Sequence, residues 1–156
     1  MEDNRELQNQ VEFLYNAAAK PLYNLALYTT GDPALAQQVT IDAFVDSFHS
    51  IPDKTDLELF MNKSTKLLYR YIRKVRKDNY DQAALLITTR DANSLDAERK
   101  KQLDKLCRLS PKERYILLLF CWQRFSLKRI AKTISLPVFI AKKSLFAALN
   151  KAVKEV

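Results

Sequence analysis

Glycine is almost absent from this chain: Gly31 is the one glycine among 156 residues. Tight β-turns and glycine loops around phosphates need several residues that adopt positive φ angles. The scarcity of glycine therefore argues against a turn-rich β fold and against the glycine-dependent nucleotide fingerprints. It predicts an all-α protein whose helices are joined by short turns.

Cysteine and long apolar runs are scarce too. Cys107 and Cys121 lack the spacing of a CxxC pair or a metal site, and both lie among apolar residues, which favours packed thiols in a reducing compartment. The longest apolar run, Tyr115 to Trp122, is far shorter than the roughly 18 residues needed to cross a bilayer. The N-terminus is acidic, unlike a signal peptide. We therefore expect a cytoplasmic protein without stable membrane insertion.

Histidine occurs once, as His49, so serine and cysteine nucleophiles have no other histidine to act as a base. Asp42 and Asp46 lie four residues apart on the helix that also carries His49. A metal site is conceivable there, but a lone histidine at a helix C-terminus is more typical of a partner for the helix dipole. We expect no enzyme activity, no metal site and no cofactor.

Charge is distributed unevenly along the chain. Residues 1–58 carry ten acids and three bases, and residues 59–77 carry seven bases and no acid. Residues 78–108 balance, and residues 109–156 carry ten bases and two acids. Two concentrated basic segments favour a polyanion partner, because each cation placed on a phosphate releases a condensed counterion.

Helical periodicity and capping signals divide the first half into three helices. The first is predicted from Arg5 to Thr30, with Pro21 kinking or splitting it. Asp32 should cap a second helix that ends near residues 49–52. Residues 55–58 read as a capping box that starts a third helix, which has one apolar and one cationic face.

The second half shows the layout of a helix-turn-helix. Residues 110–113 combine a capping box with proline at the first helical position. Ser126 should cap a short helix, residues 135–137 should form a turn, and a longer cationic helix should begin at Val138. Ser94 is a candidate cap for a helix through Arg108. The expected organisation is two small helical domains, at 1–77 and 95–156, joined by a linker at 78–94.

At this point the sequence resembles the bacterial sigma factors of the extracytoplasmic-function group, which keep regions 2 and 4. The resemblance covers most of residues 11–77 and 109–153, and depends on the order and spacing of both halves. The residues that carry it in the first half are Leu14-Tyr15, Pro21 to Ala26, Gly31-Asp32, Ala36, Ala43, Phe44, Phe60 and Arg76-Lys77. In the second half they are Leu109 to Arg114, Ile116 to Leu119, Ile130-Ala131, Ile140, Lys143 and Ala147.

The resemblance implies a protein that joins core RNA polymerase. Region 2 would open and read the minus-ten element, region 4 would read minus-thirty-five DNA, and an anti-sigma factor is a possible further partner. By position, Gln38, Ile41 and Asp42 would meet the polymerase clamp, and of these Asp42 keeps the family's chemistry. The chain also departs from the family pattern at Lys63, Arg70, Arg129 and Ser135.

Two groups of residues are predicted to bind DNA. On the third helix, cations surround an aromatic ring on which a base could stack, as in single-strand binding sites: Lys63, Lys66, Tyr69, Arg70, Arg73, Lys74, Arg76 and Lys77. Tyr71 is expected in the core. At the helix-turn-helix, Val138, Phe139, Ala141 and Lys142 would face base edges, whereas Lys128, Arg129 and Lys143 would hold phosphates.

Three functions remain open on the sequence. The first is a polymerase-binding initiation factor, and the second is a helix-turn-helix regulator that no longer binds polymerase, which the departures at Gln38 and Ile41 would explain. The third is an interaction module that sequesters an acidic protein. The cations of the third helix could also neutralise the acidic residues of 1–58 instead of binding DNA.

Overall fold

The computed structural model describes residues 2–74, 106 and 108–153, and every element in these ranges is an α-helix. The predicted fold class, all-α, is therefore confirmed. The proposed linker, the helix expected between Ser94 and Arg108, and the predicted DNA contacts Arg76 and Lys77 lie outside the described residues. In chain order the helices are α1 (Glu2–Thr30), α2 (Pro33–Ser50), α3 (Leu57–Lys74), α6 (Pro111–Cys121), α7 (Leu127–Ile134) and α8 (Val138–Val153).

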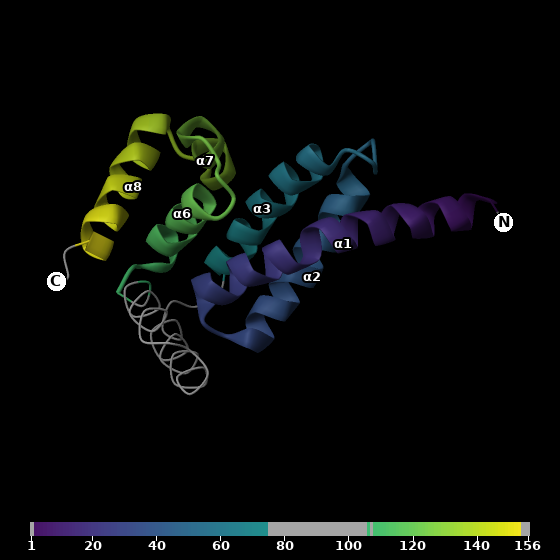
Figure 1. Cartoon of the computed structure of the whole chain (residues 1–156), viewed down its shortest axis with the longest axis horizontal. Coiled ribbons are helices and arrows are strands. Elements are labelled where there is room, and N and C mark those ends of the chain that lie inside the picture. The colour runs from purple at the N-terminus through teal and green to yellow at the C-terminus, as the bar shows by residue number, and fades with distance from the viewer. Residues whose placement is uncertain (1, 75–105, 107, 154–156) are drawn as a thin grey trace.

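The first three helices pack together around the buried side chains Leu14, Leu22, Phe60 and Leu68. Pro21 does not split α1, which is one helix from Glu2 to Thr30. Its N-terminal part extends beyond the other helices, as Figure 1 shows, and its side chains there are exposed. The core of this group therefore involves the C-terminal two thirds of α1.

The turn between α1 and α2 forms as the sequence predicts. Gly31 has a φ of 72°, and its N–H donates to the carbonyl of Leu27 at 2.7 Å, which closes α1. The Asp32 carboxylate accepts hydrogen bonds from the backbone N–H groups of Ala34 and Leu35 at 3.0 and 3.2 Å. Asp32 therefore caps α2, with Pro33 as its first residue.

The capping box predicted at residues 55–58 is wrong. The Thr55 hydroxyl donates to the Asp53 carboxylate at 2.6 Å, and the carboxylate of Asp56 accepts from the backbone N–H of Leu59 at 3.0 Å. Asp56 is thus the residue that caps α3. Thr55 is drawn away because the aspartate two residues before it offers a local turn that competes with the helix start.

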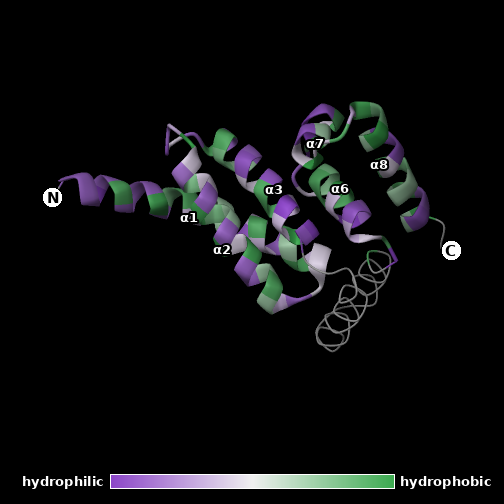
Figure 2. Cartoon of the chain, turned by 180° about the vertical axis from the view of Figure 1, so that it is seen from behind, coloured by the Kyte–Doolittle hydropathy of each residue, from purple (hydrophilic) through white to green (hydrophobic). Residues whose placement is uncertain are grey.

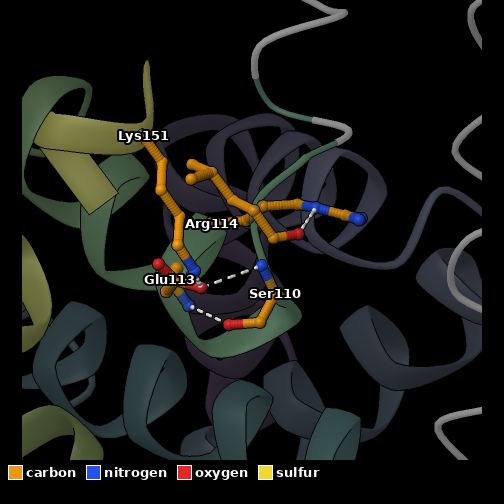
Figure 3. Close-up of polar contacts among 5 residues, drawn as sticks. Ser110, Glu113, Arg114 and Lys151 are labelled. Carbon is orange, nitrogen blue, oxygen red and sulfur yellow. Dashed lines mark hydrogen bonds and ion pairs between the residues drawn. The ribbon is translucent and has the colours of Figure 1, made fainter. Parts of the chain in front are cut away.

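Helix α6 is the centre of the second group, and residues 113–119 are all buried. Its capping box is confirmed: Ser110 Oγ accepts from the Glu113 N–H at 3.2 Å, and the Glu113 carboxylate accepts from the Ser110 N–H at 3.2 Å (Figure 3). Cys121, expected to be packed, is exposed at the end of this helix. Helices α7 and α8 both pack against α6.

The two groups of helices also pack against each other, α1 against α6 and α3 against α7 (Figure 1). Buried apolar residues of both groups belong to one hydrophobic cluster. Figure 2 shows that hydrophobic and hydrophilic residues alternate along each helix, as expected where one face packs and the other meets solvent. Whether the chain divides into domains at 1–77 and 95–156 stays a prediction.

Candidate nucleic-acid interface

Helices α7 and α8 form where the sequence predicts a short helix, a turn and a longer helix. Ser126 Oγ accepts from the Arg129 N–H at 3.2 Å and begins α7. Ser135 ends it in the left-handed region, at φ 57° and ψ 44°, where a non-glycine residue is uncommon. The N–H of Leu136 then donates to the carbonyl of Ala131 at 3.0 Å. Because Ile130, Ile134, Ala141 and Leu145 are buried, the two helices are held by a small apolar core.

The first turns of α8 present a mixed apolar and cationic surface. Val138 is exposed, Phe139 is 72% exposed, and Lys142 and Lys143 are both exposed. The Lys142 ammonium lies 5.9 Å from the centre of the Phe146 ring, on the same face of the helix. The prediction that Ala141 faces base edges is wrong: its side chain is 0% exposed and belongs to the core between the helices.

The cationic face predicted on α3 is present in the structure. Lys63, Arg70, Arg73 and Lys74 are exposed and Lys66 is half-buried. No ion pair between described residues joins these cations, or those of α7 and α8 at 128–143, to a carboxylate of α1 or α2. The alternative that they neutralise the acidic N-terminal segment therefore gains no support from the part of the chain that the structure describes.

The prediction that Tyr69 stacks on a base is wrong for this structure. Tyr69 is 6% exposed, and its ring centre lies 4.9 Å from that of Tyr115 on α6. Burial raises the pKa of the Tyr69 hydroxyl, although the nearby Arg73 guanidinium lowers it. The packing of the second helical group on α3 thus covers the ring that the sequence pattern had placed on the DNA face.

Tyr71, expected in the core, is half-buried instead. Its hydroxyl donates to the Asp46 carboxylate on α2, and this hydrogen bond is the main reason that the pKa of Tyr71 is raised to about 12. The Lys74 ammonium lies 5.7 Å from the centre of its ring. Tyr71, and not Tyr69, therefore keeps part of its ring at the surface of α3.

The three residues predicted to contact polymerase lie on the exposed face of α2. Gln38 donates from Nε2 to both carboxylate oxygens of Asp42, at 3.1 and 3.2 Å, and Ile41 is 50% exposed. Ile41 and Tyr15 line a surface hollow of about 730 Å³ between α1 and α2. The structure thus brings these residues together as one surface, with an apolar centre and a polar edge.

Residues that sequence reasoning missed join the two helical groups. The guanidinium of Arg114, 1% exposed, donates to the carbonyls of Leu109 and Thr29, at 2.9 and 3.0 Å (Figure 3 shows Arg114). The Tyr115 hydroxyl donates to the Thr65 carbonyl. The sequence gives no signal for the contacts with Thr29 and Thr65, because these backbone carbonyls lie 85 and 50 residues away in the chain.

Further contacts between the groups come from Arg129 and Trp122. Arg129 donates from Nε to Asn62 Oδ1 at 2.5 Å, and its guanidinium lies 3.6 Å from the centre of the Phe125 ring. The Trp122 ring centre lies 5.0 Å from that of Tyr28 on α1. Arg129, predicted to hold a phosphate, is therefore partly engaged within the protein.

The metal alternative at Asp42, Asp46 and His49 is not formed. No group of three His, Cys, Asp or Glu side chains within the described ranges is placed to hold a metal ion. No helix in the same ranges is both long and apolar enough to cross a membrane.

The chain is similar to a protein of known structure, although no relative is found from its sequence. No protein-family model and no curated protein matches the sequence. Among solved structures, the chain is similar to the sigma factor RpoE from Bartonella quintana, in its complex with the anti-sigma factor NepR. The alignment covers 96% of each chain with a TM-score of 0.59 and 13% identity. At that identity the similarity shows a shared fold.

Proposed function

We propose that this chain is a sigma-type transcription initiation factor, which binds core RNA polymerase and directs it to promoter DNA. The observation that carries the proposal is the shared fold with a sigma factor over 96% of both chains. The exposed start of α8 supports the DNA-binding part, and the surface formed by Gln38, Ile41 and Asp42 supports the polymerase-binding part. A protein partner of the anti-sigma class and a cytoplasmic location follow from the same proposal.

Polymerase binding is tested by a pull-down of purified core enzyme with the wild-type chain and with Ile41→Glu. We expect the wild type to bind, and the variant to lose at least tenfold in affinity, because a carboxylate replaces the apolar centre of the α2 surface. Val153→Glu, which alters a similarly exposed apolar residue at the end of α8, is the matched control. Equal binding by Ile41→Glu would show that α2 does not form the contact.

Promoter recognition is tested by factor-dependent transcription from genomic fragments incubated with core enzyme. Initiation at defined start sites is the expected result. Specific binding to DNA without any binding to core would instead identify a helix-turn-helix regulator. Binding to neither, together with capture of an acidic protein, would identify an interaction module.

The DNA-docking face is tested with Lys142→Ala combined with Lys143→Ala. We expect weaker binding to promoter duplex, and a fall of about 0.9 in the slope of log K against log salt concentration, because Lys143 loses a phosphate contact and Lys142 a contact at base edges. Lys20→Ala combined with Lys112→Ala removes the same charge from α1 and α6 and should leave the slope unchanged. An unchanged slope in the α8 variant would exclude this face.

A further inference from the structure

A groove runs between α3 and α7, where the two helical groups meet. It consists of two hollows, of about 290 and 410 Å³, and Lys66 and Thr133 line both of them. In one hollow, α3 residues between 58 and 66 face residues between 126 and 133, and in the other, residues 66–74 face residues 133–135 at the end of α7. The two helices therefore run in the same direction past two adjoining hollows, which together are called here the α3–α7 groove.

Both walls of the groove are cationic. Helix α3 contributes Lys66, Arg70, Arg73 and Lys74, and α7 contributes Lys128, Arg129 and Lys132. Glu58 is the one carboxylate among the residues that line the two hollows. None of these cations forms an ion pair with a carboxylate of the described residues. The groove thus combines seven positive charges with one negative charge.

The cations recur at a regular interval. Lys66, Arg70 and Lys74 are four residues apart on α3, and Lys128 and Lys132 are four residues apart on α7. Four residues of helix rise by about 6 Å, so each wall carries a row of charges along its length. The Arg129 side chain on α7 is held in place by its hydrogen bond to Asn62 of α3 and by its contact with the Phe125 ring. Such rows suit an extended anion with evenly repeated charges.

The width of the groove limits the shape of that anion. Packed helices have axes about 8–10 Å apart, and a nucleic-acid duplex is much too wide to enter the space between them. A single strand is narrow and flexible, and binds where its phosphates meet cations along a groove. Apart from Tyr69 and Ile134, the lining side chains are polar or charged, so the walls offer little that would recognise an apolar ligand.

We propose that the α3–α7 groove binds the phosphodiester backbone of a single-stranded nucleic acid, and that both helices hold the same strand. This goes beyond the proposed function, in which the two helical groups meet separate stretches of promoter DNA. A strand in this groove bridges α3 and α7, and so stabilises the molecule with its two groups packed together. Lys132, which the sequence reasoning did not select, belongs to this site.

The test measures fluorescence anisotropy of a labelled twelve-residue oligothymidylate mixed with the full chain, without polymerase. Two positive charges are removed from each wall in turn. The α3 variant combines Lys66→Ala with Arg70→Ala, and the α7 variant combines Lys128→Ala with Lys132→Ala. We expect each pair to weaken binding about tenfold or more and to lower the salt slope by about 1.4, since two single-strand phosphate contacts are lost. Lys20→Ala with Lys112→Ala, which removes two charges outside the groove, should leave strand binding unchanged.

Three outcomes would overturn the proposal. One is an α7 pair that binds the strand like the wild type, because then α3 alone would hold it. Another is equal loss from the Lys20 and Lys112 control pair, which would indicate a diffuse charge effect. The third is oligoglutamate of the same length competing as well as the strand, which would assign the groove to an acidic peptide. Oligouridylate in parallel distinguishes RNA from DNA, and circular dichroism verifies that each variant keeps its helices.

This test does not depend on the outcome of the polymerase experiments. A chain that fails to bind core enzyme can still bind oligothymidylate through both walls, and the proposal then stands without the initiation function. A chain that binds core enzyme but tolerates loss of the α7 wall keeps its proposed function and lacks the groove site.

Discussion

The hydroxyl of Tyr115 on α6 donates one hydrogen bond to the backbone of α3. Tyr115→Phe removes the hydrogen bond to the Thr65 carbonyl and keeps the buried ring. We expect the free energy of unfolding to fall by about 1 kcal/mol, the usual net value of such a bond. Urea denaturation measures it, with Tyr15→Phe, at an exposed ring, as the control. Equal stability of both variants would show that the bond contributes nothing.

Arg114 should contribute more to stability than the Tyr115 hydroxyl, because its charged guanidinium is buried between α1 and α6. Its hydrogen bonds to Leu109 and Thr29 satisfy a charge that water would otherwise solvate. Arg114→Lys cannot reproduce the planar fork that reaches both carbonyls, and should cost about 1.5–3 kcal/mol in urea denaturation. Arg124→Lys, on an exposed arginine of the loop before α7, should leave the midpoint unchanged. A similar loss in both variants would contradict the role given to Arg114.

For single residues, the sequence predicted the exposure of charged side chains better than that of aromatic side chains. Lys63, Arg70 and Lys142 are exposed as expected, because a charged head group stays in solvent wherever the helix packs. Tyr69 is buried where exposure was expected, and Tyr71, expected in the core, is half-buried against it. The periodicity of α3 describes one buried stripe, whereas the helix packs against α1 and α2 and also against α7, and that second contact cannot be read from α3 alone.

At the scale of elements, the start of α6 and the end of α8 share one ion pair. Glu113 accepts from the Lys151 ammonium at 2.9 Å as well as from Ser110 (Figure 3). Burial raises the pKa of Glu113, but its bonds to Lys151 and Ser110 outweigh burial and lower it below the ordinary 4.5. A lowered folded-state pKa contributes stability that is complete above about pH 4.5 and is lost as the pH falls through the folded-state value.

Lys151→Met should therefore reduce stability in a pH-dependent way. At neutral pH the loss should be below about 1 kcal/mol, since the Lys151 side chain is 55% exposed and screened by solvent. Below about pH 4.5 the difference between wild type and variant should shrink, because Glu113 becomes protonated in both. Unfolding curves in urea from pH 7 to pH 2 measure this, with Lys151→Arg as the charge-preserving control. A difference that is constant over pH would refute the assignment.

Helix boundaries were the most predictable elements, because each cap is a local event. Asp32, Ser110 and Ser126 all cap the helices that the sequence assigned to them. The failure at residues 55–58 has a local cause as well, since Asp53 competes for Thr55. Of the two outcomes predicted at Pro21, the split is wrong, because α1 continues as one helix through the residue that lacks an N–H, and the kink stays a prediction.

For the whole molecule, the contact between the two helical groups is the feature that sequence patterns could not supply. It depends on side chains that meet partners far away in the chain, such as Arg129 with Asn62 and Trp122 with Tyr28. The order of the helices and the short turn between α7 and α8 could be predicted, because capping and periodicity are local. The packing of the two helical groups against each other, called here the closed arrangement, could not be predicted, and neither could the burial of Tyr69 that results from it.

The closed arrangement can be weakened without disturbing either group. Asn62→Ala combined with Tyr28→Ala removes the partners of Arg129 and Trp122. We expect a larger radius of gyration in small-angle X-ray scattering and an unchanged helical content in circular dichroism. Tyr15→Ala combined with Asn150→Ala, at exposed positions, is the control. A scattering curve identical to that of the wild type would mean that other contacts suffice to hold the groups together.

Trp122 gives the molecule a built-in optical reporter. It is the chain's one tryptophan, and its half-exposed indole sits against Tyr28 of the other helical group. If α6 and α1 separate, the indole loses that neighbour and becomes fully hydrated, so its emission should move to longer wavelength. Stopped-flow mixing with polymerase, DNA or a regulatory protein could then time the opening of an unlabelled, unmodified chain.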